Sequence, residues 1–382
     1  MRILVAPDSF KGALSAKEAA AAIAEGVRVA DERVELEVMP VADGGEGLAE
    51  CLVAAIGGHR IETMVRGPLG GPLRAAYALL PDGTAVIEAA AALGLSLLPK
   101  TSGSIVQANS WGLGDLIRHA VDAGADSIVV GLGGSGTNDG GIGLLSSLGV
   151  QFMGPEGPLS PVPLSLQALD HLDLRGLYPP LSDVSIRVAC DVDNPLCGSR
   201  GATAVYGPQK GVAPLQVPLL DAALARFACV VARDLQRDVA DMPGAGAAGG
   251  VGAAFAGVLG TRLERGIDLV LDAVGFDEHL DRADWVITGE GRTDSQSAEG
   301  KVVHGIARRA RAKGIPVLCL SGEITLGANV LRDAGVTAML AIPFGPCTLQ
   351  ESMERTRENL SRAASEAMRL ILTANLTAHR PS

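Results

Sequence analysis

Residues 2–30, RILVAPDSFKGALSAKEAAAAIAEGVRVA, contain the pattern that decides the fold. The apolar run at 2–6 predicts a short buried strand, and the loop PDSFKGALS follows it. Ser15 and Glu18 then match the capping box that opens helices, which predicts a helix over roughly 16–29. A buried strand, a polar loop and a helix in this order are typical of a parallel sheet covered by helices.

The next segment repeats the same order. VELEVM at 34–39 alternates as a strand does, and ADGGEG at 42–47 opens a second helix that ends at Gly57-Gly58. The order returns near the end of the chain, where we predict strands at 284–288, 316–320 and 337–342 and helices at 301–313, 327–334 and 349–373. The two ends of the chain therefore have one style of construction.

The middle of the chain is built differently. Three strand-like pieces at 60–66, 73–79 and 84–89, separated by Gly/Pro turns, predict an antiparallel meander. We therefore predict an α/β protein with two domains, a number that also suits a chain of 382 residues. Residues 1–66 plus 286–382 would form a doubly wound parallel-sheet domain built from both chain ends, and 67–285 an inserted mixed α/β domain.

Composition narrows the class of protein. The net charge of −11 provides no basic surplus to neutralise nucleic-acid phosphates. The six cysteines form no CxxC pair or zinc-like spacing, and no apolar run approaches the 18 residues of a membrane span. The N-terminal residues also lack the layout of a signal peptide. We expect a cytoplasmic protein that binds neither nucleic acid nor a membrane.

Polar loops follow the predicted strands, where ligands bind in open α/β sheets. The first contains Asp8, Ser9 and Lys11, and the second Asp43, Gly44 and Gly45. Lys11 beside a glycine suits a phosphate contact, and paired glycines at a helix start can point backbone N–H groups at an anion. Both loops can equally be capped turns, with Asp8 or Asp43 bonding to the backbone.

The third loop, GLGGSGTNDGG at 131–141, lies between an apolar strand and a helix. Its small residues can wrap phosphates, which makes Gly133, Gly134, Ser135, Thr137, Asn138 and Asp139 candidate contacts. It includes a literal G-x-G-x-x-G, the pattern of dinucleotide-binding proteins, but a chain this rich in glycine contains about one such match by chance. A Walker A loop is absent, because Gly300-Lys301 is followed by valine.

Three later segments complete the set of candidate loops. CDVDNPLCG at 190–198 and YGPQKG at 206–211 supply Asp191, Asn194, Gln209 and Lys210. TGEGRTDSQ at 288–296, with Lys301 after it, supplies Glu290, Arg292, Asp294 and Gln296. Carboxylates at strand ends can hold Mg²⁺ or take a proton from a hydroxyl. The tract GAGAAGGVGAAFAG at 244–257 can be a ligand loop or a closely packed helix.

Together these loops resemble the glycerate kinase family of bacteria, the type that lacks a P-loop. The matching segments are PDSFKG (7–12), ADGGEG (42–47), the loop at 131–141, CDVDNPLCG with YGPQKG, GAAGG (246–250), and TGEGRTDSQS (288–297) with Gly300-Lys301. They follow the family order over nearly the whole chain. The resemblance implies a flavodoxin-like domain built from both ends, with ATP, Mg²⁺ and D-glycerate as ligands at a cleft between two domains.

The resemblance and the chemistry of phosphoryl transfer together give each loop a predicted role. The glycine-rich loop and Lys11 would hold ATP phosphates, Glu290 and Asp294 would place Mg²⁺, and Asp191 would deprotonate the glycerate hydroxyl. Lys210 or Arg292 would pair with the glycerate carboxylate. The 2-hydroxyl is the favoured acceptor; a glycerate 3-kinase, a nicotinamide-dependent oxidoreductase and a non-catalytic ligand sensor are the alternatives, and a homo-oligomer is compatible with all of them.

Overall fold

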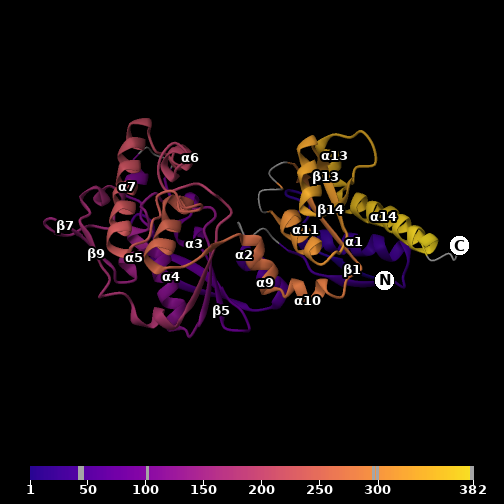
Figure 1. Ribbon diagram of the computed structural model, residues 1–382, viewed down its shortest axis with the longest axis horizontal. Helices are drawn as coiled ribbons and strands as arrows, with labels where there is room; N and C mark the ends of the chain where they lie inside the picture. Colours follow the sequence, from indigo (N-terminus) through magenta and orange to yellow (C-terminus); the bar gives the residue numbers. More distant parts are fainter. Residues whose placement is uncertain (42–46, 100–102, 295–296, 298–300, 379–382) are drawn as a thin grey trace. The chain divides into compact units, whose positions relative to one another are not determined.

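The computed structural model describes residues 1–41, 47–99, 103–294, 297 and 301–378, and the chain divides into two compact units (Figure 1). Unit 1 comprises residues 1–43 and 267–382, and unit 2 comprises residues 44–266. The two ends of the chain thus form one unit, but its boundaries differ from the predicted 66 and 285. The helix that follows residue 47 packs against the sheet of unit 2, and the next strand belongs to that sheet, so both lie in unit 2. At the other boundary, Ile267 packs against Gly305 and so lies in unit 1.

A parallel five-stranded sheet forms the centre of unit 1, in the order β14-β13-β12-β1-β2. Its strands are β1 (Arg2–Val5), β2 (Glu35–Val38), β12 (Trp285–Thr293), β13 (Val317–Ile324) and β14 (Val336–Ala341). β1 lies between β2 and β12 and is buried, with Ile3 and Val5 fully covered. Numbered along unit 1, the strand order is 2-1-3-4-5.

Helices cover both faces of this sheet. α1 (Ala16–Ala30) and α14 (Thr356–Ala378) lie side by side and share a core with β1, β12 and β13, while α11 (Val302–Ala312) and α12 (Val330–Ala334) pack near β13 and β14 (Figure 1). The other helices of the unit are α9 (Gly266–Ala273), α10 (Phe276–Leu280), η10 (Leu326–Asn329) and α13 (Leu349–Glu354). The predicted capping box is confirmed, since the Ser15 hydroxyl accepts from the Glu18 N–H and the Glu18 carboxylate accepts from the Ser15 N–H.

Two predictions for unit 1 were wrong in extent. The single helix predicted at 349–373 is two helices, because the chain breaks at Arg355 after the capped α13. β12 runs on to Thr293, through residues predicted as loop. Pairing of Arg292 and Thr293 with Glu323 and Ile324 of β13 extends both strands past their glycines.

Gly26 allows α1 and α14 to approach closely. A Cβ atom at this position would lie 1.9 Å from the Ser361 backbone oxygen of α14. We expect Gly26→Ala to lower the free energy of unfolding by about 2–4 kcal/mol, because backbone on both sides must move. Urea denaturation would measure this, with Gly345→Ala as the control, since a Cβ there meets nothing within 4 Å. Equal midpoints for the two variants would contradict the prediction.

Unit 2 is built on a six-stranded mixed sheet in the order β11-β10-β6-β5-β4-β3. Its strands are β3 (His59–Arg66), β4 (Pro72–Leu79), β5 (Thr84–Glu88), β6 (Ser127–Gly131), β10 (Ser185–Ala189) and β11 (Leu263–Glu264). The predicted antiparallel meander is confirmed as β3, β4 and β5, and β5, β6, β10 and β11 run parallel. A small sheet of β7 (Gln151–Gly154), β8 (Gly157–Pro158) and β9 (His171–Asp173) was not predicted.

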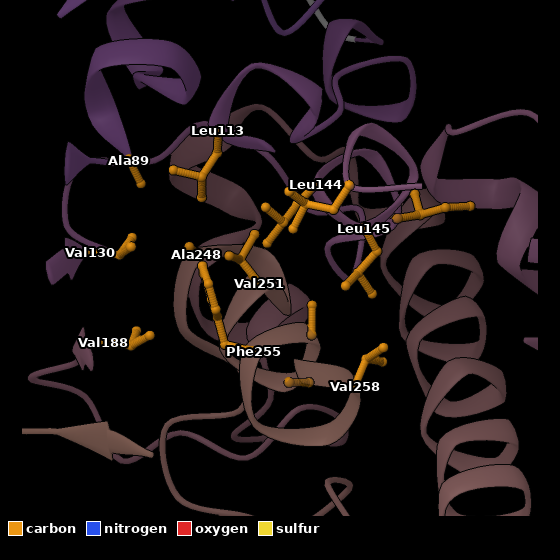
Figure 2. Packing of buried hydrophobic residues seen from close by; sticks show 14 of the residues in the cluster. Ala89, Leu113, Val130, Leu144, Leu145, Val188, Ala248, Val251, Phe255 and Val258 are labelled. Carbon is orange, nitrogen blue, oxygen red and sulfur yellow. The ribbon is translucent and has the colours of Figure 1, made fainter. Parts of the chain in front are cut away.

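The helices of unit 2 enclose one large apolar core (Figure 2). The α-helices among the described residues of this unit are α2 (Leu48–Ile56), α3 (Ala90–Leu93), α4 (Trp111–Asp122), α5 (Ile142–Ser147), α6 (Ala202–Tyr206), α7 (Val217–Leu235) and α8 (Val251–Ala253). Figure 2 shows Val130 and Val188 of the sheet facing Val251 and Phe255, so the glycine-alanine tract at 244–257 lies inside this core. Residues 214–235 form a helical segment long and apolar enough to cross a bilayer by length and composition; Phe227 and Val231 of this segment belong to the core.

Candidate active site

The loops after β1 and β12 meet in unit 1 because the two strands are parallel neighbours, so their carboxyl ends lie at one edge of the sheet. The Asp8 N–H donates to the Gly289 oxygen at 2.9 Å, which ties the two strand ends together. Phe10 is buried in the core and anchors the first loop, while Lys11 beside it is exposed. Lys11 therefore lies at the edge of the sheet formed by the carboxyl ends of the strands, on a backbone that the buried Phe10 side chain holds in place.

These two loops line a cavity of about 480 Å³ in unit 1. Its polar lining includes seven of the predicted site residues, namely Asp8, Ser9, Lys11, Glu290, Arg292, Asp294 and Lys301. With Glu323, four carboxylates and three cations thus line this cavity, and Ser352 and Thr356 add to its walls. Residues of the first and last candidate loops thus line one cavity of unit 1; Asp43, Gly44, Gly45 and Gln296 lie outside the described residues.

Glu290 is the most buried carboxylate of this cavity, at 7% exposure. The Thr293 hydroxyl donates to its Oε1 at 3.0 Å. Burial raises the pKa of Glu290, and hydrogen bonds from Ser297 and Thr293 and the charge of Lys301 act in the opposite direction. Asp294 is paired with the Arg292 guanidinium at 3.4 Å, and Arg292 also reaches Glu323 at 3.6 Å. The two acids lie four positions apart with different surroundings.

A chain of buried hydroxyls supports Glu290 from behind. The Thr293 hydroxyl is 2.6 Å from that of Ser321, which lies on the neighbouring β13, and both side chains are fully buried. Sequence reasoning missed both residues. Thr293 stood inside the quoted motif, but nothing in the sequence placed Ser321 next to it, since that contact depends on strand register.

We predict that Thr293→Val lowers kcat/KM by about 5- to 50-fold, because the substitution keeps the shape and removes one hydrogen bond that fixes Glu290. Thr293→Ser retains the hydroxyl and is expected to stay close to the wild-type rate. Steady-state kinetics on both variants would test this, with thermal unfolding to show that each is folded. Equal rates for valine and serine would mean that the hydroxyl does not position Glu290.

The glycine-rich loop after β6 lies in unit 2 beside the end of β10. Gly133 and Gly134 are exposed, whereas Ser135, Thr137, Asn138 and Asp139 are buried. Lys210, from the short turn η5 (Pro208–Lys210), donates to the Thr137 oxygen at 2.8 Å and to the Ser135 hydroxyl at 3.3 Å. The structure thus brings Lys210 to Ser135 and Thr137, from which it is more than 70 residues away in the sequence.

Two predicted ligand contacts in unit 2 have structural partners instead. The Asp139 carboxylate is fully buried and accepts from the Ser110 N–H and hydroxyl, both at 2.7 Å, and from two further backbone N–H groups. Asn194 donates to the Arg200 oxygen and accepts from the Tyr206 hydroxyl. We therefore reassign both residues to support of their loops. Gln209 is exposed and carries no comparable contact among the described residues.

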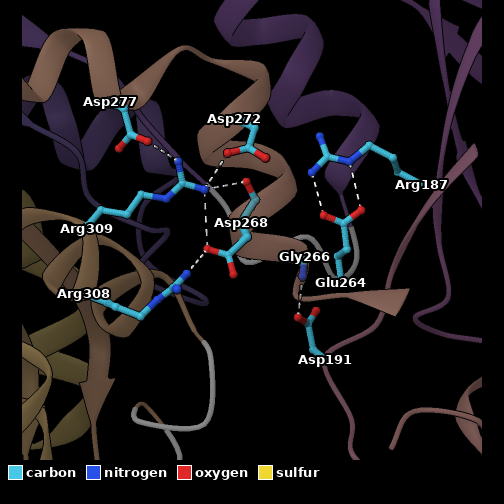
Figure 3. A network of polar contacts seen from close by, with 9 residues as sticks. All are labelled: Arg187, Asp191, Glu264, Gly266, Asp268, Asp272, Asp277, Arg308 and Arg309. Atoms are coloured by element: carbon cyan, nitrogen blue, oxygen red, sulfur yellow. Dashed lines mark hydrogen bonds and ion pairs between the residues drawn. The ribbon is translucent and has the colours of Figure 1, made fainter. Parts of the chain in front are cut away.

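Asp191 follows β10 and lies beside Gly266, the residue at which the chain leaves unit 2 (Figure 3). Its Oδ1 accepts from the Gly266 N–H at 2.8 Å. The same segment is fixed by a two-armed ion pair between Arg187 and Glu264 and by contact of Arg265 with Asp193. Asp191 is exposed, so its carboxylate remains accessible while one oxygen holds the backbone.

A separate set of ion pairs lies within unit 1 (Figure 3). Arg309 of α11 pairs with Asp272 at 2.7 Å and Asp277 at 3.1 Å, and Arg308 and Arg309 both contact Asp268. The Arg309 side chain is only 13% exposed among these carboxylates, and it fixes α9 and α10 to α11.

The family model for the glycerate kinase family matches residues 3–372 of this chain. The chain belongs to the glycerate kinase family. Among its relatives are glycerate kinase of Bacillus subtilis, 43% identical with 96% of each chain covered, and glycerate 2-kinase of Escherichia coli, 42% identical with 95% of this chain and 96% of the relative covered. A crystal structure of a Salmonella typhimurium LT2 protein matches with a TM-score of 0.86 and 42% identity, covering 98% of this chain and 99% of that one.

Family membership agrees with the resemblance predicted from the loops. The match extends over both units, so every loop of the glycerate kinase pattern described above falls inside it.

Proposed function

We propose that this protein transfers the γ-phosphoryl group of ATP to a hydroxyl of D-glycerate, with 2-phosphoglycerate and ADP as products. The observation that carries the proposal is the unit 1 cavity, where Lys11, Arg292 and Lys301 face Glu290 and Asp294. Phosphoryl transfer needs cations that neutralise phosphate oxygens and carboxylates that hold the accompanying metal. The family and the name of the Escherichia coli relative support glycerate as acceptor and the 2-hydroxyl as its site.

The chemistry of Glu290 and Asp294 fits Mg²⁺, which prefers oxygen ligands and is commonly bound by one or two carboxylates together with substrate phosphates and water. Among the described residues no group of three or more His, Cys, Asp or Glu side chains could hold a metal alone. Protein carboxylates and ATP oxygens would therefore share the ion. When bound, Mg²⁺ would neutralise charge on the phosphates.

The remaining chemistry belongs to the chain's own residues. Lys11, Arg292 and Lys301 would bind the phosphates of ATP and orient the γ-phosphorus. Asp191 would accept the proton of the glycerate hydroxyl while the oxygen of that hydroxyl forms a bond to the γ-phosphorus. The bond between the γ-phosphorus and the β–γ bridging oxygen would break, and ADP would depart. The step moves one proton and one phosphoryl group, and nothing is oxidised or reduced.

A coupled assay of ADP release with D-glycerate tests the proposal. Enolase consumes 2-phosphoglycerate directly but needs phosphoglycerate mutase before it can use 3-phosphoglycerate, so omitting the mutase identifies the product. ADP release that requires D-glycerate, with mutase-independent conversion, is the expected result. A requirement for mutase would make the enzyme a 3-kinase, and absence of glycerate-dependent ADP release would refute the proposal. Thermal stabilisation by NADH instead of MgATP would favour the oxidoreductase alternative.

Three further features belong to this proposal. We propose that unit 1 is flavodoxin-like, supported by its 2-1-3-4-5 strand order. We propose a cytoplasmic location, supported by six cysteines that all lie in the described part of the chain and form no disulfide there, as expected in a reducing compartment. We propose small-molecule ligands and no nucleic-acid partner, supported by the net charge of −11; association into a homo-oligomer is compatible with these features.

A further inference from the structure

Lys210 is a buried cation that has no paired anion in the described part of the chain. It is 7% exposed, and its Nζ donates to the neutral oxygens of Thr137 and Ser135. No carboxylate among the described residues forms an ion pair with it. Burial lowers its pKa to about 8, and the charge of Asp139 acts in the opposite direction. A buried charge is costly unless a counter-charge meets it, and an ammonium has three protons, of which these contacts use two.

Asn138, the neighbour of Thr137, has an acceptor that nothing satisfies. It is 1% exposed, and its Nδ2 donates to the Thr203 hydroxyl at 2.9 Å. Its Oδ1 is one of two buried side-chain polar atoms without a hydrogen-bond partner in the described part of the chain. Buried acceptors are nearly always satisfied in folded proteins, so an orphan of this kind points to a donor supplied by a ligand.

The backbone around Thr137 and Asn138 is held in place by a neighbouring segment that has a strained conformation. Ala248 has φ 51 and ψ 35, a left-handed conformation that non-glycine residues rarely adopt, and its oxygen lies 3.5 Å from the Thr137 hydroxyl. A Cβ on Gly249 would lie 2.1 Å from the Thr137 oxygen, so only glycine lets the two segments meet. The surroundings therefore fix the positions of Thr137 and Asn138 rather than leaving them to adjust.

A ligand that met both groups would have to satisfy two different requirements. Lys210 needs an anion, and Asn138 Oδ1 needs a hydrogen-bond donor. A fully ionised phosphate supplies only acceptors, so it would satisfy Lys210 and leave Asn138 unsatisfied. A hydroxy acid supplies a carboxylate and an adjacent hydroxyl. The Ser135 hydroxyl, which accepts from Lys210, also retains a proton to donate to a carboxylate.

We propose that Lys210, Ser135 and Asn138 form the subsite for the acceptor, with Lys210 and Ser135 binding the carboxylate of a small hydroxy acid and Asn138 Oδ1 accepting from one of its hydroxyls. The inference rests on the proposed function for the identity of the acid, D-glycerate. It moves this part of the glycine-rich loop from ATP to the acceptor and gives it the task of selecting a hydroxylated substrate.

The test measures binding and kinetics on the full chain. Calorimetry without nucleotide would compare D-glycerate with lactate and 3-hydroxypropionate, which each lack one hydroxyl, and with glycerol, which lacks the carboxylate. We expect Lys210→Met to weaken D-glycerate, in Kd and in KM, by about 50-fold or more, while KM for ATP changes less than about threefold. The Asn138→Leu variant should bind D-glycerate no more tightly than the wild type binds the analogue that lacks the contacted hydroxyl. Lys17→Met, which removes an exposed cation of α1, is the matched control.

The outcomes separate this inference from the proposed function. If Lys210→Met raises KM for ATP instead, or changes neither KM, the subsite is refuted even though the wild type phosphorylates glycerate. If the wild type binds D-glycerate with Lys210-dependent affinity and releases no ADP, the subsite stands and the proposed function fails. Should either variant unfold, the analogue series on the wild type decides: equal affinity for D-glycerate and for both single-hydroxyl acids would overturn the role of Asn138.

Discussion

Asparagine in place of Asp191 is expected to lower kcat for D-glycerate by about 10²- to 10⁴-fold, the range that a positioned general base contributes. The substitution separates two tasks of this side chain. The amide oxygen of asparagine can still accept from the Gly266 N–H, so the segment that leaves unit 2 stays fixed. It cannot take the proton of the substrate hydroxyl. Activity should therefore fall while thermal unfolding stays near the wild-type midpoint.

Asp193→Asn is the matched control for Asp191→Asn. Asp193 lies two positions away and pairs with Arg265, and its side chain is 69% exposed, so loss of its charge should change kcat less than about threefold. ADP release at saturating ATP and D-glycerate measures both variants. If the kcat of Asp191→Asn stayed within tenfold of the wild-type value, another residue would have to be the general base.

Replacing Glu290 with glutamine is expected to lower kcat by about 10²- to 10³-fold, comparable to removal of one electrostatic contact to a transition state. Glu290 is the buried carboxylate of the unit 1 cavity, and its charge is the part that glutamine lacks. The Mg²⁺ concentration needed for half-maximal rate should rise as well. Glu323→Gln, at the exposed side of the same cavity, should stay within about threefold of the wild type.

Stability provides a second readout for Glu290. Because burial raises its pKa, the wild type loses stability as pH rises from below the ordinary glutamate pKa through the raised value. Glu290→Gln removes that loss. We expect the variant to be more stable than the wild type at pH 7, with the difference shrinking as pH falls toward 4. A variant that is less stable at every pH would show that the carboxylate serves the fold rather than the reaction.

Much of the unit 1 cavity could be predicted because its residues follow strands whose type was evident from the sequence. Lys11 and Glu290 are 279 positions apart, yet both follow apolar parallel strands, and such strands align their carboxyl ends. The helix start at Ser15 was equally predictable, since a capping box is a local pattern. The capping box and the adjacency of the two strands were thus within reach of local pattern and strand order.

The parts that could not be predicted depend on contacts across the fold. Asp139 looked like a ligand contact, but its partner Ser110 lies 29 positions away on another segment, and only packing turns the carboxylate inward. Ser321 meets Thr293 through the register of β12 and β13, and Thr203 meets Asn138 through the position of α6. The boundaries of the two units were misplaced for the same reason, because α2 follows its contacts with β4 and β5 instead of its neighbours in the sequence.

The strand order of unit 1 also has a consequence for the timing of protein synthesis. β1 lies between β2, made soon after it, and β12, which begins at Trp285. At about 5–20 residues per second, β1 and β2 would wait roughly 15–60 s for their neighbour to emerge from the ribosome. A pair of strands is marginal alone. Unit 2 is continuous in sequence, so it can be complete first, and the N-terminal segment is the part of the nascent chain most exposed to chaperones and proteases in the interval.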